Sequence, residues 1–197
     1  RNMQKVLKMC DAAITTTEGM AEELKHYVPK VFINRNTASE EMLKLSEEAY
    51  EKAVAEKKAE GRKTVKLGYF SGSITHNDDF ILIQPAVAKI MEKYPQTELH
   101  IAGILDIPKE FEAFKERVIA HPFADWKKLP EMIASMDINL APLEESIFNE
   151  AKSENKWVEA ALVRVPTIAS NLGAFKRMIE HNKTGILANT CEEWYEG

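Results

Sequence analysis

Three polar side chains recur at three-residue intervals in one segment: Ser153, Lys156 and Glu159. The apolar residues of that segment follow helical spacing, so the three side chains are predicted to lie along one stripe of a helix. Free N–H groups at the helix start favour an anion, and Lys156 adds a positive charge. The stripe is about 9 Å long, which suits a diphosphate at one end and ribose hydroxyls at the carboxylate. The alternative is a surface helix with a weak Lys156–Glu159 ion pair.

A second candidate is the turn after the apolar run Val65–Phe70. It begins with Ser71, Gly72 and Ser73 and leads into a predicted helix. Ligands bind at the carboxyl ends of parallel strands, and helix N-termini favour phosphate, so this turn is a candidate phosphate loop. It has a single glycine and no GxGxxG or Walker pattern, so an ordinary turn with a helix cap is the alternative.

An aromatic side chain follows another predicted strand, where Pro122 and Phe123 could hold a nucleobase by stacking or through main-chain hydrogen bonds. Trp126 is predicted to belong to the core. His76 and His121 have no carboxylate or cysteine beside them in the sequence, which favours packing or surface roles over metal binding or a catalytic triad.

Short apolar runs that alternate with longer amphipathic segments must position these residues. The predicted strands are Ala13–Thr17, Val31–Asn34, Val65–Phe70, Glu98–Ala102, Arg117–Ala120, Asp137–Ala141, Pro166–Ser170 and Gly185–Ala188. The predicted helices are Glu18–Tyr27, Ser39–Glu60, Asp78–Tyr94 (kinked, or beginning near Pro85), Trp126–Ser135, Glu154–Val163 and Ala174–His181. Strands separated by helices predict an α/β fold with a doubly wound, Rossmann-like parallel sheet.

The domain organisation follows from a change in composition near residue 64. Residues 38–63 are rich in Glu and Lys with a thin apolar stripe, which predicts a solvated helical connector. Its expected ion pairs are Glu40–Lys44 and Glu48–Lys52. The main domain is expected at 64–197, and residues 1–37 look like the tail of another unit. The sequence opens on Arg1 and ends as an apolar segment begins, so we expect a piece of a longer protein.

The composition excludes several classes of protein. The 197 residues are 45% hydrophobic and 29% charged, with 26 basic and 31 acidic side chains and a net charge of −5, as in ordinary globular proteins. Such a charge attracts neither nucleic acid nor an anionic membrane. No apolar run reaches the 18 residues of a membrane span, so a soluble protein is expected. Cys10 and Cys191 are far apart, which favours reduced thiols and no metal site.

The segments together resemble the GT-B glycosyltransferases of family 4, the group 1 nucleotide-sugar transferases, and in particular their C-terminal donor-binding domain. The matching segments, in family order, are 66–73, 99–103, 118–123, 129–143 and 153–173. The most specific block runs from Ser153 through Lys156 and Glu159 to Pro166 and Ser170, and is similar to the family's S-x-x-K-x-x-E-x-x-A…G-x-P-x-x-A-S.

The resemblance implies roles for these residues. Glu159 would bind the ribose, Lys156 and Ser153 would face the diphosphate, the loop from Ser71 to Ser73 would close over phosphate or sugar, and the backbone at Pro122 and Phe123 would hold the base. Two departures suggest a divergent subfamily. Ala151 stands where the family's E-x7-E pattern has Glu, a role that Glu150 or Glu154 could fill, and Val165 stands where glycine usually precedes the proline.

The resemblance also implies an activity: transfer of a sugar from a nucleotide diphosphate to a hydroxyl of a glycan, lipid or other acceptor, with retention and without a metal or cofactor. Residues 1–37 would end the N-terminal acceptor domain, so the piece alone should bind donor and transfer little, and acceptor-side catalytic residues would lie outside it. The expected location is cytoplasmic, with peripheral membrane contact an option for the full-length protein. The alternatives are a non-catalytic binding or scaffolding module, which Ala151 favours, and a sugar-nucleotide epimerase.

Overall fold

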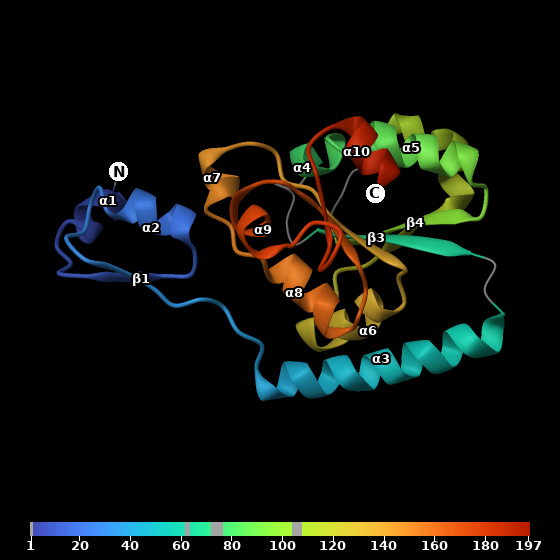
Figure 1. Ribbon diagram of the computed structural model, residues 1–197, viewed down its shortest axis with the longest axis horizontal. Coiled ribbons are helices and arrows are strands. Elements are labelled where there is room, and N and C mark those ends of the chain that lie inside the picture. Colours follow the sequence, from blue (N-terminus) through green and yellow to red (C-terminus); the bar gives the residue numbers. More distant parts are fainter. Residues whose placement is uncertain (1, 62–63, 72–76, 104–107) are drawn as a thin grey trace.

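The computed structural model describes residues 2–61, 64–71, 77–103 and 108–197. It contains a small two-stranded parallel sheet near the N-terminus and a six-stranded parallel sheet in the main body, joined by an extended segment and a long helix (Figure 1). Gly72, Ser73 and His76, which the sequence singled out, lie outside the described residues.

The large sheet is parallel throughout, with the strand order β5-β4-β3-β6-β7-β8. From β3 the chain steps outward to β5, then returns to the other side of β3 at β6, so the winding direction reverses between β3 and β6. The predicted doubly wound sheet is confirmed. Its strands are β3 (Val65–Ser71), β4 (Thr97–Gly103), β5 (Val118–His121), β6 (Ile138–Ala141), β7 (Thr167–Ser170) and β8 (Ile186–Ala188).

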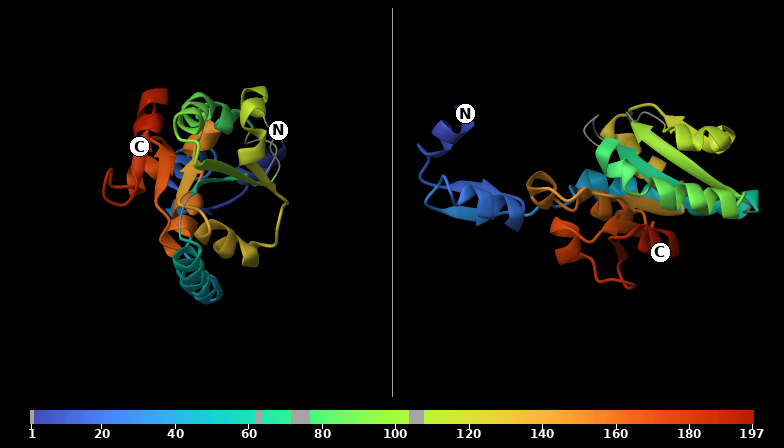
Figure 2. Two further views of the ribbon diagram at one scale, coloured as in Figure 1. Left: turned by 90° about the vertical axis from the view of Figure 1, so that its right-hand side faces the viewer. Right: turned by 90° about the horizontal axis from the view of Figure 1, so that it is seen from above.

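Helices cover both faces of this sheet, as the end-on view in Figure 2 shows. One face packs through Tyr69 and Leu99 against a layer of α4 (Asn77–Ile81), α5 (Gln84–Lys93), the 3-10 helix η2 (Lys109–Arg117) and α10 (Cys191–Glu196). The other face is covered by the 3-10 helix η3 (Trp126–Lys128), α6 (Leu129–Ala134) and α8 (Asn155–Leu162), and α3 (Glu40–Glu60) packs on the outside of α6 and α8 (Figure 1). Two short helices, α7 (Ile147–Glu150) and α9 (Gly173–Met178), complete the domain.

Several boundaries differ from the prediction for local reasons. The expected helix Asp78–Tyr94 is two helices, and Pro85 lies in the first turn of α5, where its missing N–H leaves no hydrogen bond unmade. Arg117 ends η2 instead of starting β5, because its guanidinium donates to the carbonyls of Met91 and Thr97. The described helices α1, α7, α10 and η2 were not predicted.

The helix predicted over Ser39–Glu60 is confirmed as α3. Its buried residues are Ser46, Ala49 and Ala53, flanked by half-buried apolar residues of the same stripe, whereas Val54 is 45% exposed. Small side chains allow the close approach of α3 and α6. The expected pairs are wrong: the observed ones are Lys44–Glu48 and Lys52–Glu56, both at 3.9 Å.

The N-terminal unit comprises α1 (Asn2–Leu7), β1 (Ala13–Thr15), α2 (Glu18–Leu24) and β2 (Val31–Ile33), and it projects to one side of the main body (Figures 1 and 2). It touches the segment between α7 and α8. The fully buried Thr17 donates its hydroxyl to the carbonyl of Ala151 at 2.7 Å. At Gly19 an added Cβ would lie 2.3 Å from the carbonyl oxygen of Glu150, so this contact requires glycine.

Candidate functional site

A cavity of about 550 Å³ opens at the carboxyl ends of β3, β4 and β5, beside the point where the winding reverses. Open α/β sheets bind ligands in this crevice. The lining brings together five residues predicted for the site: Ser71, Pro122, Phe123, Lys156 and Glu159. The other lining residues are Phe70, Ala102, Gly103, Ala124, Asp125, Trp126, Leu129, Met132 and Asn155.

Lys156 supplies the positive charge of this cavity. Its Nζ atom is buried, has no hydrogen-bond partner in the described structure, and lies 5.1 Å from the centre of the Tyr69 ring. Burial lowers the pKa of Lys156 to about 8, against the opposing attraction of Asp79. A buried cation without a hydrogen-bonding partner is costly, so a site that keeps one is suited to an anionic ligand.

Glu159 lies one turn further along α8. Burial raises the pKa of its carboxyl group, and the nearby Lys156 acts in the opposite direction. Both side chains line the cavity from one helix, as their spacing predicts. The helix begins at Asn155, so the N–H groups of its first turn face the same end as Lys156.

Asp79 organises the neighbouring loop. Its side chain is 3% exposed, and its Oδ1 accepts hydrogen bonds from the backbone of Glu144 at 2.8 Å and from Asn149 at 3.0 Å. Its Oδ2 accepts from Lys152 at 3.3 Å. This carboxylate thus joins α4 to the segment before α8, and the sequence analysis missed it, since its partners lie more than 60 residues away.

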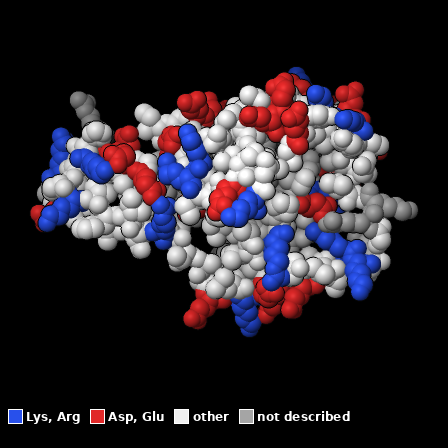
Figure 3. All heavy atoms as spheres, viewed as in Figure 1, with Lys and Arg blue, Asp and Glu red and all other residues white. Residues whose placement is uncertain are grey.

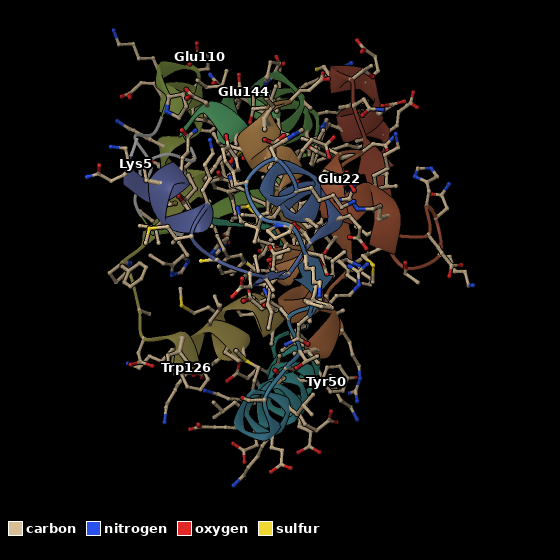
Figure 4. The ribbon with its side chains drawn as sticks, turned by 90° about the vertical axis from the view of Figure 1, so that its left-hand side faces the viewer. Lys5, Glu22, Tyr50, Glu110, Trp126 and Glu144 are labelled. Carbon is tan, nitrogen blue, oxygen red and sulfur yellow. The ribbon has the colours of Figure 1, made fainter. Side chains whose placement is uncertain are left out.

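The prediction that Trp126 is a core residue is wrong. Asp125 caps η3 by accepting from the backbone N–H of Lys127 at 2.9 Å, which places Trp126 at the rim of the cavity, 45% exposed. Figure 4 shows it at the end of the molecule where η3 lies close to α3. Phe123, 74% exposed, lines the same cavity. Two exposed aromatic rings are suited to a flat ring system.

Two predicted site residues lie elsewhere. Ser153 precedes the helix, because the N-cap of α8 is Glu154, and its Oγ accepts a hydrogen bond from Asn36 at 3.2 Å. Glu150 belongs to α7, where its carboxylate lies 3.9 Å from Arg177. Neither is among the described residues that line the cavity, whereas Asn155, which the sequence analysis did not name, is. Its (i, i+4) relation to Glu159 was the available signal.

A second, more polar cavity of about 380 Å³ lies between α8 and the connection that leads to α3. Its lining residues are Asn36, Thr37, Ala38, Ser39, Met42, Trp126, Asn155, Val158, Glu159 and Leu162. It shares Trp126, Asn155 and Glu159 with the first cavity.

His121 forms a contact that the sequence did not predict. Its ring stacks on His100 with 5.2 Å between centres, and the rings share a 2.9 Å hydrogen bond. The other nitrogen of His100 lies 3.0 Å from Glu98. Burial lowers the pKa of His100, with smaller opposing effects from Glu98.

Acid is expected to destabilise the fold through His100. The unfolded state binds a proton near the ordinary histidine pKa of about 6.5, whereas the folded state resists it, so stability is lost as the pH falls below that value. We expect urea unfolding to show a smaller drop between pH 7.5 and 5.5 in His100→Gln than in the wild type. Equal drops in the two proteins would contradict this.

Within the described ranges, no three His, Cys, Asp or Glu side chains gather in a way that could hold a metal ion. None of the described helices combines the length and hydrophobicity needed to cross a bilayer. Acidic and basic side chains are interspersed on the face shown in Figure 3.

The comparison with protein families decides the identity. The family described as glycosyl transferases, group 1, matches residues 66–196, which include every residue that lines the first cavity. The chain belongs to this family. The predicted resemblance is thereby confirmed. In this group 1 glycosyl transferase, the first cavity is lined only by residues of the segment that matches the family. No curated protein matched the chain.

Solved structures of glycosyltransferases share the fold. Anabaena HepE in complex with UDP-glucose has a TM-score of 0.69 at 17% identity, covering 98% of this chain and 56% of HepE. WaaG, involved in lipopolysaccharide biosynthesis, has a TM-score of 0.67 at 17% identity, covering 93% of this chain and 51% of WaaG. S. aureus TarM, solved with UDP, has a TM-score of 0.68 at 12% identity, covering 99% of this chain and 38% of TarM. The group 1 glycosyl transferase chain thus spans about half of the length of these proteins, or less.

Proposed function

We propose that this chain is the donor-binding part of a glycosyltransferase that transfers a hexosyl group from a UDP-sugar to a hydroxyl of a glycan, with retention. The observation that carries the proposal is the buried Nζ of Lys156, which no described residue hydrogen-bonds and which lies beside Glu159 in a cavity at the carboxyl ends of the strands. HepE, TarM and a pneumococcal O-GlcNAc transferase, all of similar fold, were solved with UDP.

The proposed mechanism is electrostatic. Lys156 and the free N–H groups of α8 stabilise the charge that develops on the leaving diphosphate, which lowers the barrier to sugar transfer. Glu159 accepts hydrogen bonds from the ribose hydroxyls, and the backbone at Pro122 and Phe123 holds the base. Residues 38–63 form the connector and residues 64–197 the nucleotide-sugar domain, while residues 1–37 end the acceptor domain. A cytoplasmic location fits a nucleotide-sugar substrate.

Calorimetric titration with UDP, GDP and ADP tests the donor site. We expect saturable binding of UDP, weakened at least tenfold, or about 1.4 kcal/mol, by Glu159→Ala, since the ribose hydroxyls lose their acceptor. Glu192→Ala, the same change on the distant helix α10, is the control and should bind as the wild type does. Failure of all three nucleotides to bind the folded chain would overturn the proposal.

The second candidate is a module that binds nucleotide sugars without transferring them. The observation that favours it is Ala151 at the position of the first glutamate in the family pattern; its carbonyl accepts from Thr17. Incubation of the full-length protein with UDP-glucose distinguishes the two, because a transferase releases UDP by transfer or slow hydrolysis and a binding module does not.

A further inference from the structure

Two cavities meet at one edge of α8, and the three residues that they share form the boundary: Trp126, Asn155 and Glu159. Asn155 and Glu159 are four residues apart on the helix, so their side chains are neighbours on one face. Any ligand that reaches Glu159 from the first cavity therefore also comes within reach of the Asn155 amide.

A buried hydroxyl group needs both a hydrogen-bond acceptor and a hydrogen-bond donor as partners. A ribose hydroxyl donates one hydrogen bond and accepts others, whereas an ionised carboxylate can only accept. Glu159 can therefore satisfy the proton of the hydroxyl but not its lone pairs. The Nδ2 group of Asn155 is a donor, and nothing in the described structure accepts a hydrogen bond from it.

The orientation of the Asn155 amide is set from the connection between β2 and α3. There Asn36 donates through its Nδ2 to the Oδ1 of Asn155 at 3.1 Å and to the Oγ of Ser153 at 3.2 Å. Because the amide oxygen of Asn155 is engaged by Asn36, its NH2 group is directed to the other side. Only a hydrogen-bond donor at position 36 can hold the Asn155 amide in this orientation, since an ionised carboxylate at that position has no proton to donate.

The neighbours of Asn36 hold the connection in place. Arg35 pairs with Glu18 of α2, and its Nη1 lies 4.0 Å from the carboxylate of Glu154, which is 4% exposed. The N-terminal unit also contacts the segment that precedes α8, because the hydroxyl of Thr17 donates a hydrogen bond to the carbonyl of Ala151. The position of Asn36 is thus tied to the start of the helix that carries the candidate site.

We propose that Asn155 donates a hydrogen bond to a ribose hydroxyl that Glu159 accepts from, and that Asn36 is a positioning residue that sets the Asn155 amide. The inference rests on the proposed function. It makes the connection between the two units part of the nucleotide specificity of the site, although Asn36 itself does not touch the nucleotide.

Calorimetric titration of the 197-residue chain with UDP, 2′-deoxy-UDP and 3′-deoxy-UDP tests the proposal. We expect Asn155→Ala and Asn36→Asp each to weaken UDP binding about five- to tenfold, the range of one lost hydrogen bond. For the deoxy nucleotide that lacks the contacted hydroxyl, the loss should fall below twofold, while the other deoxy nucleotide keeps the full loss. A purely structural role would weaken all three nucleotides equally.

The control is Asn34→Ala, an exposed asparagine two residues away whose side chain makes no hydrogen bond with the described residues, and it should bind UDP as the wild type does. Thermal unfolding confirms that each variant is folded. Equal losses for the three nucleotides, or Asn155→Ala or Asn36→Asp variants that match Asn34→Ala, would overturn the inference. If UDP fails to bind the wild type, it is the proposed function that fails.

Discussion

Replacing Lys156 with methionine is expected to weaken UDP binding about 100-fold, or about 2.7 kcal/mol, and to make the unliganded protein more stable. The two effects have one cause. The ammonium group is buried beside Tyr69 without a hydrogen-bond partner among the described residues, so the unliganded site bears the cost of the charge and the ligand relieves it. Methionine keeps most of the alkyl chain and removes the charge.

The size of the stability gain follows from the pKa of Lys156, lowered from 10.5 to about 8. Both states hold the proton at pH 7, so the burial cost is fully present there, about 3 kcal/mol by the rule of 1.36 kcal/mol per pKa unit. Methionine at this position should therefore raise the unfolding temperature by several degrees.

The stability and UDP affinity of the wild type at alkaline pH follow from the same lowered pKa of Lys156. Between pH 8 and 10.5 the unfolded state binds the proton that the folded state has lost, so stability from this group rises with pH. UDP affinity should fall over the same range, because the deprotonated amine no longer attracts a diphosphate.

Calorimetry and thermal unfolding of Lys156→Met measure both effects. Lys176→Met is the matched control: it removes the same charge from an exposed position on α9 and should change neither quantity appreciably. A Lys156→Met protein that binds UDP within threefold of the wild type would show that this ammonium group does not face the diphosphate.

Replacing Asp79 with alanine is expected to cost about 3–5 kcal/mol of stability, the range for removing one partner of a buried charged network. The substitution leaves the backbone N–H of Glu144, the amide of Asn149 and the ammonium group of Lys152 without this acceptor. It also takes away the negative charge that favours protonated Lys156. The unfolding temperature should fall by about 10 °C.

Asp78→Ala is the control for this effect, because Asp78 is the exposed neighbour on the same helix. It should cost less than about 1 kcal/mol through the helix dipole. Urea unfolding of the two variants compares them directly. If Asp79→Ala were as stable as Asp78→Ala, the carboxylate could not be the joint between α4 and the segment that precedes α8.

The main architecture could be predicted because it depends on local patterns. Each strand of the large sheet was found from a short apolar run, and the alternation with helices predicted parallel pairing. The spacing of Lys156 and Glu159 likewise predicted two groups on one side of α8, since the helical repeat fixes that relation whatever the helix packs against. The cavity contains both.

Contacts between distant segments could not be predicted in this way. The aromatic character of Trp126 favoured the core, yet the short η3 turn places it at the cavity rim. Ser153 was expected on the polar stripe at the start of the helix, but α8 begins at Asn155, one residue later than predicted. The Glu- and Lys-rich composition of α3 predicted a solvated helix, and only the folded chain shows that Ala49 and Ala53 are buried against α6.

The sequence by itself determined the family, the parallel α/β sheet and the helix that carries Lys156 and Glu159, because these follow from short-range periodicity and motif order. The tertiary structure alone decided that the Nζ of Lys156 is buried without a hydrogen-bond partner in the part of the chain that is described, that Asp79 joins α4 to the loop before α8, and that Asn36 holds Asn155. Burial and hydrogen bonding depend on groups that only the folded chain brings together. Asp79 and Glu144 are 65 residues apart in the sequence, and Asn36 and Asn155 are 119 residues apart, so no local pattern encodes these pairings.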